Sequence, residues 1–400
     1  MTGVSGPRLA VALEGAGWHP AAWREPDARP AKLLTAGYWT DLVREAEAAK
    51  LDFVTFEDFL SLRTDSRAET VEDRDDVVQG RLDAVLIASR VAPLTSRIGL
   101  IPTAVVTHTE PFHLSKAIAT LDYVSSGRAG VRVQVSGRAD EYRHFGRREP
   151  GAFHLPDSAE PDKPSALADL FDEAADYVEV LRRLWDSWED DAEIRDVATG
   201  RFVDREKLHY IDFTGRWFSV KGPSITPRPP QGQPLVTALA HAAVPYRLAG
   251  RSTDLVYVTP SDRDGAATIV GDVRAEQERA GRADETLHVF GDLVVFLDET
   301  AQAAADRKAR LDELSGAEYT SDAKVFTGTP AELADLLLDW HSAGLSGFRL
   351  RPGALPHDLT AITRGLVPEL RGRGAFRSEY EAETLRGLLG LPRPANRYAA

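Results

Sequence analysis

Short apolar runs alternate with helix-like stretches along nearly the whole chain. In the helix-like stretches, such as residues 38–49, the apolar side chains recur at helical spacing and so share one face. The predicted strands are residues 9–13, 53–56, 98–106, 130–136, 235–237, 255–258, 288–297 and 348–350. This alternation predicts parallel strands that are joined by helices, an α/β architecture.

Eight strands with intervening helices suit a TIM-type (β/α)8 barrel with insertion segments, in which about 250 residues form the core. We therefore expect residues 1–400 to form a single barrel domain. Insertions are expected at about residues 59–80, 137–164 and 190–233, which are polar or rich in proline. An open, doubly wound sheet is the alternative, but no Gly-x-Gly-x-x-Gly motif follows the first predicted strand.

Composition narrows the classes of protein to consider. The chain has no cysteine, which excludes disulfide frameworks, thiolate zinc sites and cysteine nucleophiles. Its net charge of -14 comes without a basic stripe, so we expect no nucleic-acid partner. No apolar run approaches the roughly 20 residues that span a bilayer, and no signal peptide is evident. We expect a cytoplasmic enzyme without a membrane partner.

In such a barrel the active site is built from the loops that follow the strands. Several polar or aromatic residues occupy these positions: Trp18, His19, Asp58, Thr103, His108, Gln134, Ser136 and His241. Trp18 could equally pack against the barrel. His108, Glu110 and His113 are of the types that bind metals, but their spacing matches no zinc motif on one helical face, so we expect no metal site.

Arg132 and Gln134 share one face of a strand that is otherwise made of valines. In a barrel that face points inward, where a guanidinium is costly unless it meets an anion or several acceptors. Two interpretations stay open at this point. Arg132 forms an internal salt bridge, to Glu57 or Asp58, or it binds an anionic or carbonyl-bearing ligand.

Five stretches together point to a known family. They are residues 14–24 (EGAGWHPAAWR), 103–116 (TAVVTHTEPFHLSK), 125–130 (SSGRAG), 202–230 and 344–352. On these motifs the chain resembles the bacterial luciferase-like flavin monooxygenases, in particular the nitrilotriacetate/dibenzothiophene-sulfone monooxygenase branch. The resemblance implies a barrel with insertions that uses reduced FMN, supplied by a separate reductase, to activate oxygen and attack a small organic substrate.

The resemblance also implies roles for individual residues. Asp58, Thr103, Arg132, Gln134 and Ser136 would line the flavin ring, with Arg132 in place of the family's asparagine. His241 would meet the phosphate, in a loop where the family has Gly-Ser-Ser and this chain has Ala-His-Ala, while Phe171 replaces a phosphate-binding tyrosine. Trp18 and His19 would contact the substrate, and His108 would exchange protons.

Because these phosphate contacts differ together, two other functions stay open. One is a deazaflavin-dependent oxidoreductase on the same barrel. The other is a non-catalytic barrel that has lost flavin binding. For the oxygenase we expect a transient flavin reductase partner and a homodimer or higher homo-oligomer.

Overall fold

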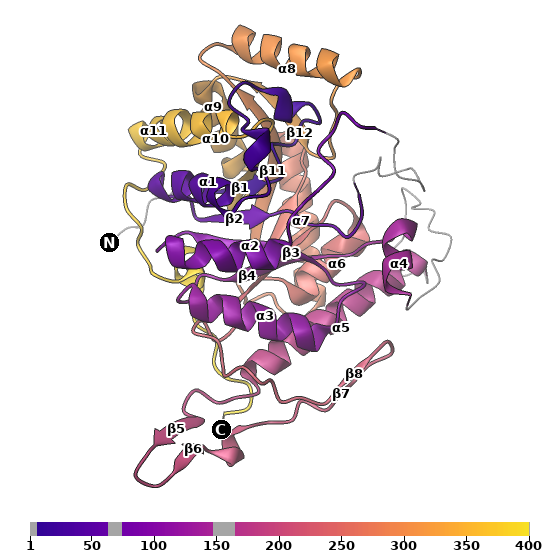
Figure 1. The fold of residues 1–400 in the computed structure, drawn as a ribbon, viewed down its shortest axis with the longest axis vertical. Coiled ribbons are helices and arrows are strands. Elements are labelled where there is room, and N and C mark those ends of the chain that lie inside the picture. Colours follow the sequence, from indigo (N-terminus) through magenta and orange to yellow (C-terminus); the bar gives the residue numbers. More distant parts are fainter. Residues whose placement is uncertain (1–5, 63–73, 147–164, 400) are drawn as a thin grey trace.

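The computed structural model describes residues 6–62, 74–146 and 165–399, and a closed parallel barrel forms its centre (Figure 1). The ring consists of β1 (Arg8–Leu13), β2 (Phe53–Phe56), β3 (Gly99–Val105), β4 (Gly130–Gln134), β9 (Leu235–Leu239), β10 (Leu255–Val258), β11 (His288–Leu297) and β13 (Gly347–Pro352). Pairing of β10 with β11 and of β1 with β13 closes the ring. The predicted TIM-type (β/α)8 barrel is confirmed, with all eight predicted strands in place.

A ninth parallel strand was not predicted. β12 (Lys324–Gly328) pairs with the second half of β11, whereas β10 pairs with the first half. Apart from its last residue, β12 is half-buried or exposed. The short run Lys-Val-Phe-Thr-Gly has no strong apolar pattern, which is why the sequence did not predict a strand there.

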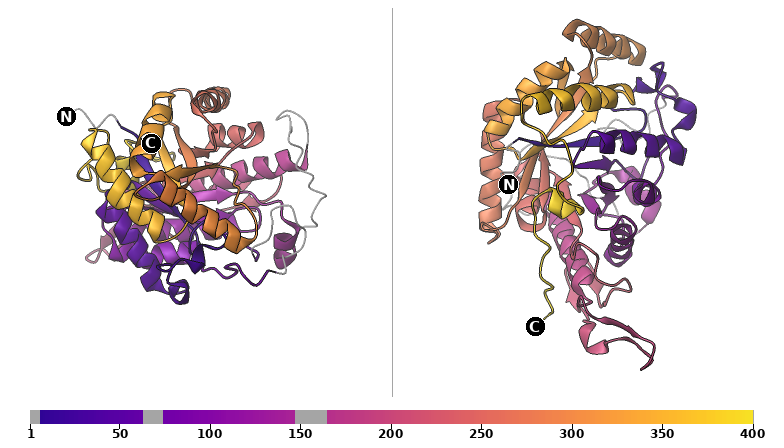
Figure 2. Two further views of the ribbon diagram at one scale, coloured as in Figure 1. Left: turned by 90° about the horizontal axis from the view of Figure 1, so that it is seen from above. Right: turned by 90° about the vertical axis from the view of Figure 1, so that its left-hand side faces the viewer.

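Helices surround the strands on the outside, as the two views of Figure 2 show. They are α1 (Ala36–Ala48), α2 (Ala84–Val91), α3 (Pro111–Val124), α5 (Ala166–Asp186), α6 (Ala243–Ser252), α7 (Arg263–Arg279), α8 (Ala301–Ser315), α9 (Pro330–Ser342), α10 (His357–Ala361) and α11 (Val367–Gly372). The helix starts follow local chemistry: Thr329 and Glu332 form a capping box at the start of α9. None of the described helices is long and apolar enough to cross a membrane.

The barrel interior is apolar at its amino-terminal end. Phe53, Ile101, Leu255 and Phe290 point inward there and form one cluster. The chain's last helix, α12 (Leu385–Leu388), lies beneath this layer, and its fully buried Leu385 joins the cluster. Water is thus excluded from this end, and access to the interior remains at the carboxyl ends of the strands.

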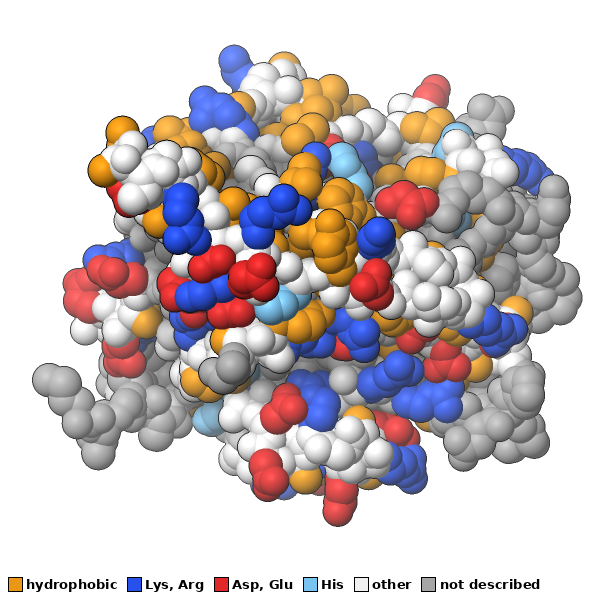
Figure 3. Space-filling model, turned by 90° about the horizontal axis from the view of Figure 1, so that it is seen from below, with side chains coloured by type: hydrophobic (Ala, Val, Ile, Leu, Met, Phe, Trp, Pro, Cys, Tyr) orange, Lys and Arg blue, Asp and Glu red, His pale blue; other side chains and the backbone are white. Residues whose placement is uncertain are grey.

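The expected insertion at residues 190–233 is more regular than its sequence predicts. It forms two hairpins, β5 (Glu193–Asp196) with β6 (Arg201–Val203) and β7 (Phe213–Thr214) with β8 (Ser219–Val220). The hairpins project away from the barrel beside the C-terminus (Figure 1). From below, basic, acidic and hydrophobic side chains intermingle on the surface (Figure 3).

The other two expected insertions are described only in part. Residues 147–164 and 63–73 lie outside the described residues. Just before residues 147–164 the chain forms α4 (Ala139–Phe145), a short helix that the polar sequence did not predict.

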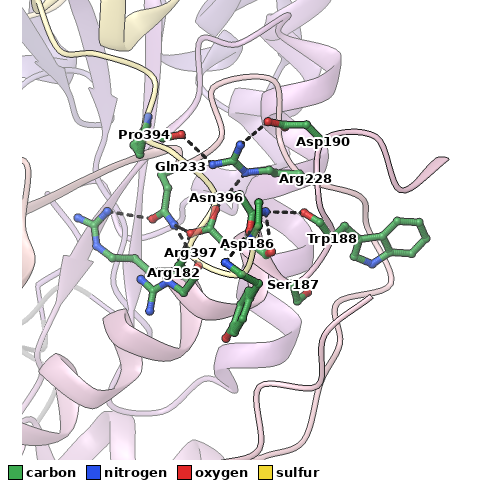
Figure 4. A network of polar contacts seen from close by, with 12 residues as sticks. Arg182, Asp186, Ser187, Trp188, Asp190, Arg228, Gln233, Pro394, Asn396 and Arg397 are labelled. Atoms are coloured by element: carbon green, nitrogen blue, oxygen red, sulfur yellow. Dashed lines mark hydrogen bonds and ion pairs between the residues drawn. The ribbon is translucent and has the colours of Figure 1, made fainter. Parts of the chain in front are cut away.

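A polar network, which we call the tail network, ties the C-terminal segment to the end of α5 (Figure 4). It consists of Arg182, Asp186, Asp190, Arg228, Gln233, Arg393, Asn396 and Arg397. Arg228 uses all three of its nitrogens: Nε donates to Asp186 at 3.0 Å, Nη1 to Asp190 at 2.8 Å, and Nη2 to the Pro394 carbonyl at 2.8 Å. Since α5 runs antiparallel to the strands, this network lies at their amino-terminal end.

Candidate active site at the carboxyl ends of the strands

A row of alternating charges crosses the upper interior of the barrel. We call it the mouth row, and it contains, in order, Arg132, Glu57, Arg349, Asp292, Arg351 and Asp322. β4, β11 and β13 supply four of these residues, and loops beside β2 and β12 supply Glu57 and Asp322. The side chain of Asp322 is 41% exposed, whereas those of the others are at most 7% exposed.

Each buried charge in the mouth row has neighbours of opposite sign. Glu57 accepts hydrogen bonds from Nη2 of Arg132 and, at 3.0 Å, from Nη1 of Arg349. Asp292 accepts from Nε of Arg349 at 3.0 Å and from Nε of Arg351 at 2.9 Å. This alternation offsets much of the cost of removing the ions from water. Loss of one partner would leave an uncompensated buried charge.

The pKa shifts show that the cost of burying these charges is offset to different degrees along the mouth row. Burial alone would raise the pKa of Glu57, but Arg132 and Arg349 bring it below its ordinary value. Burial lowers the pKa of Arg132, and Glu57 does not fully offset this, whereas Asp292 and Glu57 together raise the pKa of Arg349. Arg132 is therefore the least compensated guanidinium of the three.

The contacts of Arg132 decide the first of the two interpretations that its sequence position left open, and they leave ligand binding as a prediction. It does form an internal salt bridge, to Glu57 and not to Asp58. Its Nε donates to Oγ1 of Thr103 and its Nη2 to Oε1 of Gln134, both at 2.9 Å. Its Nη1 has no partner among the described residues and is not one of the fully buried unpaired atoms.

Gln134 presents a second donor beside this one. Because its Oε1 accepts from Arg132, its Nε2 points elsewhere, and no described residue accepts from it. The residue is half-buried at the end of β4. Arg132 and Gln134 together offer N–H donors to a ligand with adjacent acceptor atoms.

Asp58 serves a different local role. Its Oδ1 accepts from the Phe59 N–H at 2.9 Å and its Oδ2 from the Ala84 N–H at 3.0 Å, which joins the end of β2 to the start of α2. Burial raises the pKa of Asp58 to about 6, and these backbone hydrogen bonds oppose the shift. Thr103 and Ser136 are buried, and the Ser136 N–H donates to Thr107 at 2.9 Å.

The two predicted substrate residues pack against charged groups. The guanidinium of Arg351 lies 4.7 Å from the ring centroid of Trp18. His19 is buried: its Nδ1 accepts from the Ala21 N–H and its Nε2 contacts Asp312, each at 3.0 Å. His19 also lines a pocket between the ends of β1 and β2, together with Trp23, Trp39 and Glu57. Substrate contact by Trp18 and His19 stays a prediction.

His108 lies under α4. Its ring stacks on Phe145 with a centroid distance of 5.1 Å, and its Nε2 is 3.7 Å from Oε2 of the fully buried Glu141. Glu141 also accepts the Leu60 N–H at 3.0 Å, so this carboxylate joins α4 to the loop after β2. The metal-binding interpretation of this region gains no support, since no group of three potential ligands gathers within the described ranges.

His241 is exposed in front of α6, after β9, which β4 and β3 separate from β2 in the ring. The N-cap of α6 is Ala242, which accepts no side-chain capping hydrogen bond, and Pro245 lacks an N–H. The backbone N–H groups of Ala243 and Val244 therefore lie at an uncapped helix start, which favours an anion. Phe171 packs against an apolar cluster and offers no donor.

Comparison with known proteins decides the family. The model of the luciferase-like monooxygenases matches residues 18–347, which is most of the chain. This chain belongs to the luciferase-like monooxygenase family. It is an oxidoreductase, a flavin-dependent monooxygenase, as its motifs predicted.

This family member resembles several characterised relatives over nearly its full length. It is 29% identical to the N-acetyl-S-(2-succino)cysteine monooxygenase of Bacillus subtilis, with 98% of each chain covered. It is 28% identical to the nitrilotriacetate monooxygenase component A of Aminobacter aminovorans, again with 98% of each covered. Among solved structures, a long-chain alkane monooxygenase shares the fold with a TM-score of 0.83 at 23% identity, covering 96% of each chain.

The mouth of this luciferase-like monooxygenase fits a flavin on chemical grounds. The pyrimidine edge of the oxidised ring carries two carbonyl oxygens and N1, which are acceptors, beside the N3–H, which is a donor. Arg132 Nη1 and Gln134 Nε2 are donors without described partners and suit the acceptor atoms. Thr103 fixes the Arg132 guanidinium. For a phosphate, the imidazole of His241 and the uncapped start of α6 are the donors that the chain offers in front of α6.

Sequence reasoning missed the centre of the mouth row. The sequence showed Arg349 and Arg351 only as charged residues at the last strand, and it predicted no role for Asp292. One signal was available: Asp292 is the one acid in the run His-Val-Phe-Gly-Asp-Leu-Val-Val-Phe-Leu, whose ten residues are all buried. A carboxylate in such a strand requires a buried cation nearby.

Proposed function

We propose that this protein is an FMN-dependent monooxygenase that takes reduced FMN from a separate reductase and oxygenates a small organic substrate. The observation that carries the proposal is the donor pair, Arg132 Nη1 and Gln134 Nε2, at the carboxyl end of β4. Reduced flavin, when bound, supplies the electrons and the reactive ring carbon for oxygen activation.

The chain's own residues then have three tasks. Arg132 and Gln134 orient the ring by hydrogen bonds to its acceptor edge, while Thr103, Ser136 and Asp58 shape the adjoining wall. Trp18 and His19, in the loop after β1, would contact the substrate. The apolar floor of the barrel keeps water away from below, which favours productive oxygen transfer over side reactions.

Two further assignments concern protons and the phosphate. His108 would exchange a proton near the substrate, supported by its place beside Glu141 under α4. His241 and the uncapped start of α6 would bind the FMN phosphate, which makes the site prefer FMN over riboflavin. His241→Ala tests the second assignment and leaves the five buried residues of the mouth row in place.

The partners follow from the same comparisons. One relative is named as component A of a monooxygenase, and two others as subunits A and B of pristinamycin IIA synthase. We propose a transient flavin reductase partner and a cytoplasmic location. A homo-oligomer is supported by the projecting hairpins, where Val197 and Phe202 are 96% and 63% exposed. Light scattering of the purified protein measures its mass.

Flavin titration tests the proposed function. The full chain is titrated anaerobically with oxidised FMN, reduced FMN and riboflavin, with fluorescence or equilibrium dialysis as the readout. Saturable binding of reduced FMN, at least tenfold tighter than riboflavin, is the expected result. Oxygen uptake that depends on both a flavin reductase and an added organic substrate would then establish the activity. If no flavin binds to the folded protein, the proposal is wrong.

A deazaflavin-dependent oxidoreductase remains the second candidate. The observation in its favour is that Phe171 and Ala242 lack the hydroxyl groups expected around an FMN phosphate, while a deazaflavin presents the same carbonyl edge to Arg132 and Gln134. A fourth arm of the titration, with the deazaflavin cofactor, separates the two. A non-catalytic barrel would bind none of the four ligands.

A further inference from the structure

The mouth row is electrically asymmetric along its length. Its charges alternate from Arg132 to Asp322, so the row as a whole is neutral but has a positive and a negative end. The negative end, Asp322, is 41% exposed and is therefore screened by water. The positive end, Arg132, is 5% exposed, so its field is screened much less.

The positive end is also where the row has unused hydrogen-bonding capacity. Every side-chain nitrogen of Arg349 and Arg351 donates to Thr55, Glu57, Asp292 or Asp322. Arg132 alone of the three guanidiniums keeps a nitrogen, Nη1, without a partner among the described residues. A guanidinium held on two sides and open on the third is suited to bind an acceptor of fixed position.

A flavin offers two different acceptors at that position. The oxidised ring is neutral, whereas the reduced ring loses a proton from its pyrimidine part near neutral pH and then carries a negative charge on its edge. A fixed, buried positive charge distinguishes the two forms, because it attracts the anion more strongly than it attracts the carbonyl oxygens of the neutral ring.

We propose that Arg132 makes the mouth select the anionic, reduced flavin over the oxidised form, and that Glu57 is a positioning residue that holds the Arg132 guanidinium in place. The inference rests on the proposed function, since it requires a flavin at the end of β4. It adds the physical cause of selectivity: a guanidinium charge on β4 that Glu57 and Thr103 hold in place.

The position of Glu57 predicts an unusual pair of effects. Removing Arg132's charge weakens the binding of the reduced form specifically. Neutralising Glu57 removes a negative charge from the same place, so the potential at the ring becomes more positive, although Arg132 loses one anchor. If Arg132 acts through its charge, removing that charge lowers the preference for the reduced form and neutralising Glu57 does not; a purely steric role would make both substitutions lower it.

The test measures the dissociation constants of oxidised and anaerobically reduced FMN for the full chain at pH 8. The ratio of the two constants is compared among wild type, Arg132→Gln, Arg132→Lys and Glu57→Gln. Arg228→Gln in the tail network is the matched control, since it is the same substitution of a buried, ion-paired arginine at the other end of the barrel. Circular dichroism verifies that each variant is folded.

We expect Arg132→Gln to reduce the preference for reduced FMN at least tenfold, which corresponds to about 30 mV for a two-electron couple. Arg132→Lys retains most of the preference, Glu57→Gln keeps or increases it while weakening both forms, and Arg228→Gln leaves it unchanged. Should Arg132→Gln fail to fold, the binding ratios of Arg132→Lys and Glu57→Gln still test whether the charge of Arg132 causes the preference.

Two results would overturn the inference while leaving the proposed function intact. In one, Arg132→Gln binds both forms with the wild-type ratio. In the other, Glu57→Gln, or Arg132→Lys, lowers the ratio as a loss of the charge would. If wild type binds neither form of FMN, the inference and the proposed function fail together.

Discussion

The two ends of the barrel each hold a buried network of arginines and carboxylates, but they use it differently. In the tail network each nitrogen of Arg228 has an acceptor, and one of these is a backbone carbonyl of the C-terminal segment. In the mouth row Arg132 keeps Nη1 uncommitted, and Gln134 keeps its amide nitrogen uncommitted, among the described residues. A network in which every donor has an acceptor holds the chain in place, whereas a network with unpaired donors can bind a ligand.

The largest effect on stability is expected at the centre of the mouth row. Asp292→Asn leaves Arg349 and Arg351 short of an anion in a fully buried place. We expect the free energy of unfolding to fall by about 5 kcal/mol, as measured by denaturant titration. A loss below about 1 kcal/mol would mean that water reaches the row and that its charges are screened.

A smaller loss is expected from Arg228→Gln in the tail network. Asp186 keeps Gln233 and Arg397, and Asp190 keeps Arg393, so each carboxylate retains a donor. We expect the free energy of unfolding to fall by about 3 kcal/mol and the C-terminal segment to become sensitive to carboxypeptidase. Flavin binding is expected not to change. Altered binding would contradict the division of roles between the two ends.

Lowering the pH should change the stability contributions of Asp58, at the mouth, and His288, at the amino-terminal end, in opposite directions. At the mouth, burial raises the pKa of Asp58 to about 6. The folded state therefore takes up a proton at a higher pH than the unfolded chain does, so the folded state gains stability as the pH falls from about 6 toward 4. At the amino-terminal end, burial lowers the pKa of His288 to about 4, so the unfolded chain is protonated first and the folded state loses stability between about 6.5 and 4.

Each contribution is about 2 kcal/mol over that range. Denaturant titration at pH 4.5 and pH 7 measures it. Asp58→Asn should make the protein lose more stability on acidification than wild type does, and His288→Gln should make it lose less. Equal slopes for wild type and both variants would contradict the assigned causes.

The smallest expected effect is local to the ligand. Gln134→Leu removes the Nε2 donor but leaves Arg132 paired with Glu57 and Thr103. We expect the affinity for FMN to fall by about five- to tenfold, the cost of roughly one hydrogen bond, with the melting temperature within about 2 °C of wild type. Unchanged affinity would leave Arg132 as the sole ring donor.

The barrel was predictable because its strands are continuous apolar runs whose burial is the main source of stability. β12 was not, since its side chains are mostly half-buried and its pairing depends on the exceptional length of β11. The hairpins of residues 190–233 depend on contacts with the tail, as at Asp190 and Arg393, which lie far apart in sequence.

The charge network of the mouth row could not be predicted from the sequence. The strand position of Arg132 predicted a buried guanidinium; only the structure shows that it shares Glu57 with Arg349 from the opposite part of the chain. The SSGRAG motif, which carried much of the family resemblance, is structural: Arg128 donates to the backbone carbonyls of Ala92, Thr95 and Ile98 at the amino-terminal end of the barrel. A specific motif is therefore no guide to the location of the chemistry.

The most direct test of the account is a crystal structure of the full chain with FMN. The account predicts an acceptor atom on the pyrimidine edge of the ring at about 2.7–3.2 Å from Nη1 of Arg132, with the mouth row and the tail network otherwise unchanged. A flavin seated elsewhere, with Nη1 of Arg132 bonded only to water or protein, would contradict it.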